Sequence, residues 1–237
     1  MEGQRNSEWF KTFPDDHWLF SEEKAVADGT AAAEHLITHP GMKVFDCPCG
    51  DARVSIHLAK KGAIVTGLDL NPRFIKRAKE RFAEAGLDGN FYVGDMRNAS
   101  FPGGCDLFFS WANSFGFFSD EENRLFMQRM ADCIRPGGRL VIDNPNLWVV
   151  QGPPEPPEEN KAIRGDIPYF RYEYDYETNR FDAFEDGRWV FSERMYDLKE
   201  YEEMFLNCGL ELVEAYSEYF TPYDEKKRRM ILIAEKK

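Results

Sequence analysis

Residues 43–70, KVFDCPCGDARVSIHLAKKGAIVTGLDL, decide the fold. A short apolar run from Lys43 to Asp46 leads through a tight turn into a helical pattern from Val54 to Lys61. A second apolar run, Ala63 to Leu68, follows and is closed by Asp69. Two strands joined by a helix in this way predict a βαβ unit, and such units build a parallel sheet with right-handed crossovers.

The same alternation continues on both sides of this stretch. Asn71 is a natural N-cap and Pro72 suits the first helical position, so a helix is expected from there to about Ala85. Other expected elements are a helix over Thr30–Ile37, strands over Phe91–Val93, Asp106–Ser110 and Arg139–Asp143, and a helix over Glu121–Cys133. The pattern predicts an α/β fold with a mostly parallel sheet and helices on both faces.

The composition changes after Asn146. Residues 151–160, QGPPEPPEEN, hold four prolines and no apolar periodicity, which is typical of a linker or mobile loop. Aromatic and polar residues then alternate over 167–196, and Asp186-Gly187 is a hairpin signal, so three antiparallel strands are expected. A helix over Leu198–Cys208 and strands over Leu210–Tyr219 and Arg229–Ala234 should close the chain.

These patterns divide the chain into three parts. We expect an N-terminal cap segment over 1–29, a main domain over 30–146 and 197–237, and an inserted antiparallel β lid over 147–196. The length of 237 residues suits one domain with an insertion, given a prior of about 150 residues per domain.

The composition excludes several classes of protein. Lys and Arg total 30 against 42 for Asp and Glu, a net charge of −12 that disfavours nucleic acid as a partner. The mean hydropathy is −0.56, and no apolar run approaches the ~18 residues of a membrane span. The N-terminus lacks a signal-peptide core, and five cysteines without framework spacing indicate reduced thiols and a cytoplasmic protein. Aromatic residues make up 15%, which suggests an apolar cavity as well as a core.

The turn from Asp46 to Arg53 predicts a ligand site. It runs from a strand end straight into a helix, so free backbone N–H groups and the positive end of the helix dipole point at the same place. Asp69 ends the next strand, where an acid accepts ribose hydroxyls. A dinucleotide is disfavoured because only Gly50 remains of the G-x-G-x-x-G pattern. Together these features indicate a nucleoside site at the carboxyl edge of the sheet.

Five segments in order resemble the motifs of class I S-adenosylmethionine-dependent methyltransferases. They are residues 44–79 (VFDCPCGDARVSIHLAKKGAIVTGLDLNPRFIKRAK), 90–98 (NFYVGDMRN), 106–118 (DLFFSWANSFGFF), 133–146 (CIRPGGRLVIDNPN) and 193–237, with the closing helix and β-hairpin. The resemblance implies a Rossmann-like sheet of seven strands with an inserted antiparallel β lid. It is greatest to small-molecule methyltransferases with a β-rich lid, namely sugar N,N-dimethyltransferases and glycine N-methyltransferase-like enzymes.

The resemblance also implies how S-adenosylmethionine is held. Asp69 would accept the ribose hydroxyls, Asp95 the adenine amino group, and Met96 would pack on the ring. The full set of implied cofactor residues is Asp46, Cys49, Gly50, Asp69, Leu70, Asp95, Met96, Ser110 and Trp18. Asp46 either organises the cofactor or caps the loop. The family usually has glycine where this chain has Pro48 and Ala52.

The implied reaction is N- or O-methylation of a small-molecule acceptor. Expected acceptor-binding residues are Trp111, Asn113, Phe115, Tyr169, Arg171 and Trp189. His17 and Tyr172 are candidate catalytic residues, with His17 as a candidate general base, although His17 also suits a surface or packing position. The aromatic alternation either packs the sheet or walls the substrate cavity. Cys47 and Cys49 lack a second Cys or His pair, so no metal site is expected.

Two alternative functions remain open at this stage. One is a nucleoside- or cofactor-binding module without turnover, and the other is an RNA or protein methyltransferase. The sequence leaves both a monomer and a dimer open.

Overall fold

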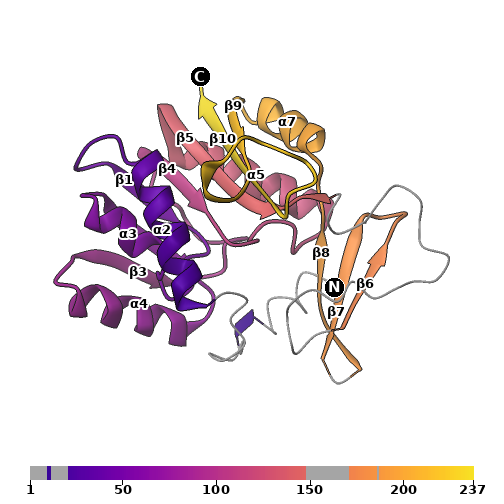
Figure 1. The fold of residues 1–237 in the computed structure, drawn as a ribbon, viewed down its shortest axis with the longest axis horizontal. Coiled ribbons are helices and arrows are strands. Elements are labelled where there is room, and N and C mark those ends of the chain that lie inside the picture. The colour runs from indigo at the N-terminus through magenta and orange to yellow at the C-terminus, as the bar shows by residue number, and fades with distance from the viewer. Residues whose placement is uncertain (1–9, 12–20, 148–170, 186) are drawn as a thin grey trace.

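The computed structural model describes residues 10, 11, 21–147, 171–185 and 187–237 (Figure 1). The proline-rich segment 151–160 and the side chains of His17, Trp18 and Tyr169 lie outside these residues.

The central sheet has seven strands in the order β3-β2-β1-β4-β5-β10-β9. β10 is antiparallel to both of its neighbours, whereas the other pairs are parallel. The strands are β1 (Lys43–Asp46), β2 (Ile64–Asp69), β3 (Gly89–Val93), β4 (Cys105–Ser110), β5 (Ile134–Pro145), β9 (Leu210–Tyr216) and β10 (Arg229–Lys236). The predicted Rossmann-like, mostly parallel sheet of seven strands is thereby confirmed.

Helices cover both faces of this sheet because successive strand residues point to opposite sides. Val44 packs on one side with α2 (Glu22–Leu36), α3 (Ser55–Lys60) and α4 (Pro72–Glu84). Phe45 packs on the other side, with helices α5 (Asp120–Cys133) and α7 (Leu198–Asn207). Asn71 caps α4 through Arg73 N–H, as its side chain and the following proline predict.

Three element boundaries differ from the sequence expectation by three residues or more. α2 begins at Glu22, not Thr30, because Ser21 caps it and Gly29 packs so closely that a Cβ would lie 2.6 Å from the His57 ring. β5 begins at Ile134, and the expected Pro136–Gly138 turn is a bulge within it. β9 ends at Tyr216 and not at Tyr219, because a 3₁₀ turn over Glu218–Phe220 follows it.

A separate antiparallel sheet lies to one side of the central sheet (Figure 1). It contains β6 (Arg171–Asp175), β7 (Arg180–Glu185) and β8 (Arg188–Arg194), all inserted between β5 and α7. Gly187 adopts φ +75° in the predicted hairpin between β7 and β8. Phe191 and Ala183 of this sheet pack against the loop that follows β4.

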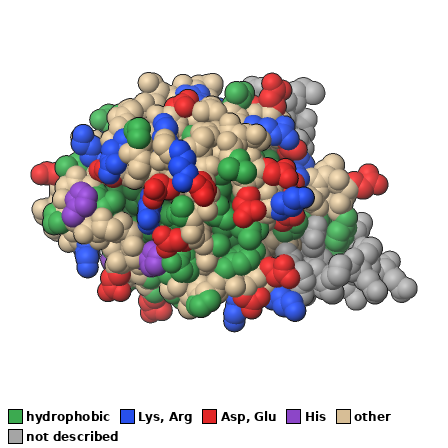
Figure 2. Space-filling view, turned by 90° about the horizontal axis from the view of Figure 1, so that it is seen from above, with side chains coloured by type: hydrophobic (Ala, Val, Ile, Leu, Met, Phe, Trp, Pro, Cys, Tyr) green, Lys and Arg blue, Asp and Glu red, His purple; other side chains and the backbone are tan. Residues whose placement is uncertain are grey.

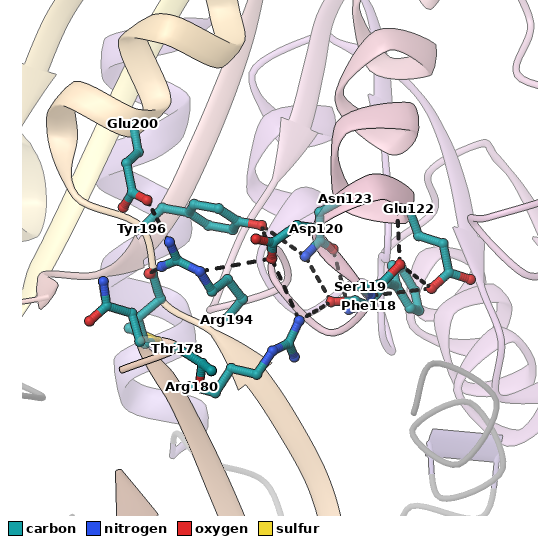
Figure 3. A network of polar contacts seen from close by, with 12 residues as sticks. Phe118, Ser119, Asp120, Glu122, Asn123, Thr178, Arg180, Arg194, Tyr196 and Glu200 are labelled. Atoms are coloured by element: carbon teal, nitrogen blue, oxygen red, sulfur yellow. Dashed lines mark hydrogen bonds and ion pairs between the residues drawn. The ribbon is translucent and has the colours of Figure 1, made fainter. Parts of the chain in front are cut away.

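Polar contacts join the three-stranded sheet to the start of α5 (Figure 3). Arg180 Nη2 donates to Phe118 O at 2.8 Å and lies 3.6 Å from Asp120. Arg194 Nε lies 3.8 Å from the same Asp120 carboxylate, and Tyr196 O–H donates to it at 3.4 Å. The β4–α5 loop is therefore held by side chains of the inserted sheet.

The surface carries charges of both signs. On the face in Figure 2, acidic and basic side chains are interspersed, with hydrophobic side chains exposed between them. Within the described ranges, no helix has the length and apolar character needed to cross a membrane.

Candidate active site

A cavity of about 200 Å³ opens at the carboxyl ends of the parallel strands. The turns after β1, β2 and β3 line one part of it, and the loop after β4 lines another. Asp28 of α2, Phe191 of β8 and Phe10 are also among the lining residues. This position is where open α/β sheets bind their ligands.

The Asp69 carboxylate links the turn after β1 to the turn after β2. Its carboxylate accepts the backbone N–H of Gly50 at 2.8 Å and that of Asn71 at 2.8 Å. Burial raises the pKa of Asp69 to about 6, although these N–H groups oppose the rise. The turn needs left-handed backbone, with Gly50 at φ 53° and the buried Ala52 at φ 59°, which explains the family's preference for glycine at position 52.

Asp46 lies at the end of β1 with 3% of its surface exposed. Burial raises its pKa to about 8, and the Asp69 charge adds to the rise. The carboxyl is therefore mostly neutral at pH 7, and a cationic ligand beside it would favour its ionised form. Burial likewise raises the pKa of the Cys47 and Cys49 thiols well above the usual range, so neither is a thiolate.

Asp51 and Arg53 form an ion pair at the cavity wall. Arg53 Nε and Nη2 lie 2.9 and 3.0 Å from the two Asp51 oxygens, and Arg81 of α4 approaches the same carboxylate at 3.0 Å. Burial would raise the pKa of Asp51, but the two guanidinium groups lower it, so the carboxylate stays charged. Nothing in the local sequence marks these two residues as a pair, although both lie in the turn from Asp46 to Arg53.

Asp95 and Met96 line the cavity after β3. Arg97 Nη2 lies 2.6 Å from Asp95. Burial would raise the pKa of this carboxyl, but the bonds from Arg97 lower it. Asp95 is therefore an ionised acceptor at the cavity wall.

The loop after β4 is held in a strained shape. Ala112 and Asn113 have φ angles of 63° and 61°, which non-glycine residues rarely adopt. Asp143 holds both residues, since its Oδ2 accepts Ala112 N–H at 2.8 Å and its backbone oxygen accepts Asn113 N–H at 2.9 Å. Arg229 pairs with Asp143 and Asp28 and lies over the Trp111 ring at 5.2 Å.

Asn113 also contacts the inserted sheet. Its Nδ2 donates to Glu193 Oε2 at 2.9 Å, and Glu193 is completely buried. Burial raises the pKa of Glu193 well above its usual value, although the hydrogen bond from Asn113 opposes the rise. Glu193 was missed from sequence because nothing local marks it, being 80 positions from Asn113.

The structure brings most of the expected site residues together. The cavity is lined by Asp46, Cys49, Gly50, Asp69, Leu70, Asp95, Met96, Trp111 and Asn113. Ser110 and Phe115 are buried in the sheet and core and do not line it. Trp189 on β8 donates to Asp182 at 3.0 Å and is also outside the lining set. Arg171 and Tyr172 are described only as backbone of β6, paired with Phe184 and Ala183.

Comparisons with known proteins agree with this architecture. Residues 44–138 match the family model described as a methyltransferase domain. Rat glycine N-methyltransferase is 30% identical over 148 residues, covering 56% of this chain and 50% of that protein. An uncharacterised Mycobacterium tuberculosis protein is 25% identical over 137 residues, covering 58% and 48%. The chain thus spans about half the length of the curated relatives it matches.

Solved structures share the fold over almost the whole chain. The CcbJ methyltransferase of Streptomyces caelestis has a TM-score of 0.71 at 19% identity, covering 99% of this chain and 97% of that one. An S-adenosylmethionine-dependent methyltransferase of Clostridium acetobutylicum has a TM-score of 0.69 at 14% identity, covering 92% and 93%. Residues 44–138 are therefore similar in sequence to a methyltransferase domain, and the Rossmann-like fold that the motifs indicated is confirmed as one that this chain shares with solved methyltransferases.

Proposed function

We propose that this chain transfers a methyl group from S-adenosylmethionine to a nitrogen or oxygen atom of a small-molecule acceptor. The observation that carries the proposal is the cavity itself, at which Asp69, Asp95 and the Cys49-Gly50 turn converge. When bound, the cofactor supplies a methyl group on a sulfonium, which is already an activated leaving group.

The residues present fit this cofactor. It carries a sulfonium, an ammonium and a carboxylate, so an acid-rich cavity with a single guanidinium complements its charges. The described lining has carboxyls at Asp28, Asp46, Asp51, Asp69 and Asp95, and a guanidinium at Arg53. Asp69 Oδ2 accepts Gly50 N–H and Oδ1 accepts Asn71 N–H, and a carboxylate oxygen has a second lone pair that can accept a ribose hydroxyl. Asp95 and Met96 are assigned to the adenine on the basis of the motif resemblance.

The chain's own contribution to rate is positioning. The loop from Trp111 to Asn113, which Asp143 holds in place, would contact the acceptor. Trp111 and Asn113 are the expected acceptor-binding residues in this loop. Holding the acceptor in line with the methyl group turns a bimolecular step into a step within one complex. An amine must arrive with its lone pair free, either by binding in the neutral form or by losing a proton.

Two measurements test the proposal. Calorimetry with S-adenosylhomocysteine should show binding that Asp69→Asn weakens and the same change at the exposed Asp88 does not. Mass spectrometry should detect a methylated product when S-adenosylmethionine is supplied with a panel of small amines and alcohols. Binding without any product would favour the non-catalytic binding module instead, and no binding would contradict the proposed function altogether.

A further inference from the structure

Two cysteine side chains meet at the amino end of β4, the end that points away from the cavity. The Sγ atoms of Cys105 and Cys133 are 3.4 Å apart, although 28 positions separate the two residues along the chain. Cys105 begins β4 and is paired in register with Ile134, the residue that follows Cys133 at the junction of α5 and β5. Gly104 N–H donates to Cys133 O at 2.8 Å, so backbone contacts hold the two cysteines side by side.

The two sulfur atoms need little movement to become bonded. A disulfide bond is ~2.05 Å long, so the sulfur atoms of Cys105 and Cys133 would have to approach each other by about 1.4 Å. Rotation of the two side chains can supply a shift of this size, because the backbones are already adjacent. The geometry therefore favours a disulfide between these two residues once an oxidant reaches them.

The thiol pair is buried beneath a short exposed segment. Cys105 and Cys133 are 5% and 2% exposed. The Cys133 thiol donates to Pro102 O at 3.0 Å, and residues 102–104 are exposed. A Cβ added at Gly103 or Gly104 would meet nothing within 4 Å, so this segment is not packed on its outer side. An oxidant of the size of water can reach the thiols when the segment opens locally, which leaves the sheet folded.

The surroundings of the pair make Cys133 the more reactive thiol. The hydrogen bond with Cys105 lowers the pKa of Cys133 and raises that of Cys105. The charge of Lys236 lowers the pKa of Cys133 further, although burial opposes this effect. The Lys236 ammonium is held in place, because its Nζ donates to Ala131 O at 2.7 Å and to Ile134 O at 2.8 Å. Since the thiolate is the nucleophile, we expect Cys133 to react first.

We propose that Cys105 and Cys133 form an oxidative modification site that takes hydrogen peroxide as its reactant. The Cys133 thiolate attacks one peroxide oxygen, the O–O bond breaks, and the hydroxide that leaves takes up a proton to become water. This step oxidises Cys133 to a sulfenic acid. The Cys105 sulfur then attacks the Cys133 sulfur, the S–O bond breaks, and the second water carries away the Cys105 proton. Two thiols and one peroxide thus give one disulfide and two waters, and a reductant restores the thiols.

The disulfide would close a covalent loop that contains β4, the loop after it and α5. Trp111 and Asn113 of the cavity lining lie within this segment. A crosslink of this span restricts the unfolded chain far more than the folded one, so it stabilises the folded state. Oxidation should therefore raise the midpoint of thermal unfolding by about 5–10 °C. This effect is independent of the proposed methyl transfer.

Mass spectrometry on the peroxide-treated protein tests the site. The protein is unfolded in iodoacetamide after treatment, so that every remaining thiol is alkylated. We expect the unreduced digest to contain the Cys105 peptide joined to the Cys133 peptide, and a phosphine reductant to separate them. Cys47 and Cys49 are an internal control, because they are also buried but pack in separate hydrophobic clusters, so both should be alkylated. A disulfide through either of them would overturn the proposal, as would Cys105 and Cys133 remaining thiols at a dose that oxidises the partly exposed Cys208.

Two variants test the effect on stability. Cys105→Ala removes one partner, so peroxide should oxidise Cys133 no further than its own acids and should leave the thermal midpoint without a rise. Cys208→Ala is the matched control and should keep both the disulfide and the rise in midpoint. A rise that survives in Cys105→Ala, or a crosslinked wild type that unfolds at the midpoint of the reduced protein, would refute the stabilising role.

Discussion

Replacing Arg229 with Met should destabilise the protein strongly, because this guanidinium lies buried between two carboxylates. Its Nη1 is 2.6 Å from Asp28 and its Nε donates to Asp143 at 2.8 Å. The three side chains are only 5%, 3% and 1% exposed. Removing one partner of a buried ion pair leaves charges without compensation and costs about 3–5 kcal/mol. That is a large part of the ~5–15 kcal/mol that stabilises a typical domain.

Arg139→Met is a matched control for this change. Arg139 also joins two carboxylates, with Glu214 at 3.1 Å and Glu235 at 3.4 Å, but its side chain is 41% exposed. Exposed pairs contribute about 0–1 kcal/mol, so this variant should unfold almost as the wild type does. Urea unfolding gives both values from the shift in midpoint at equal slope. Equal losses in the two variants would refute the assignment of the cost to burial.

Three further outcomes follow from the site and its supports. The folded-state pKa of Asp46 is raised to about 8, so its contribution to stability is present below pH ~4 and is lost as pH rises toward 8. In the wild type this loss makes the urea midpoint fall as the pH rises across this range. Asp46→Asn should remove this part of the fall, and an equal fall in both proteins would contradict the raised pKa. Asp69→Asn should cost about 2–3 kcal/mol of S-adenosylhomocysteine affinity by calorimetry, and affinity within threefold of wild type would exclude its ribose role. Gly116→Ala should lower the free energy of unfolding by about 1–3 kcal/mol in thermal unfolding, because φ is +117° and the new Cβ would lie 2.3 Å from Arg194 O. Gly103→Ala, with nothing within 4 Å, should be nearly neutral, so a similar loss there would refute the steric argument.

The fold was predictable where local signals agree with packing. Asn71 and Pro72 mark the start of α4, and the structure begins that helix at Pro72. The predicted start of α2 at Thr30 was wrong, because Gly29 has a poor intrinsic helix propensity and was taken to lie outside the helix. In the structure, the missing side chain of Gly29 lets α2 approach His57 of α3, so tertiary packing outweighs its poor helix propensity.

The site was predictable to the extent that its residues are close in sequence. Gly50 lies in the turn after β1 and Asp69 ends β2, 19 positions later, so their meeting follows from the βαβ unit. Arg229 and Asp28 are 201 positions apart, and Asn113 and Glu193 are 80 apart. These pairs depend on how the last strand and the inserted sheet return to the β4 loop, which no local pattern specifies.

The loop from Trp111 to Phe118 is held from two sides. The central sheet fixes its first half through Asp143, whereas the inserted sheet fixes its second half through Arg194 N–H to Gly116 O at 2.8 Å and Arg180 to Phe118 O. A change in the inserted sheet is therefore expected to move the loop from Gly116 to Phe118 through these bonds, while Asp69 and Gly50 keep their own contact beside the central sheet. On the proposed function, the acceptor preference can thus change through the insertion at little cost to cofactor binding.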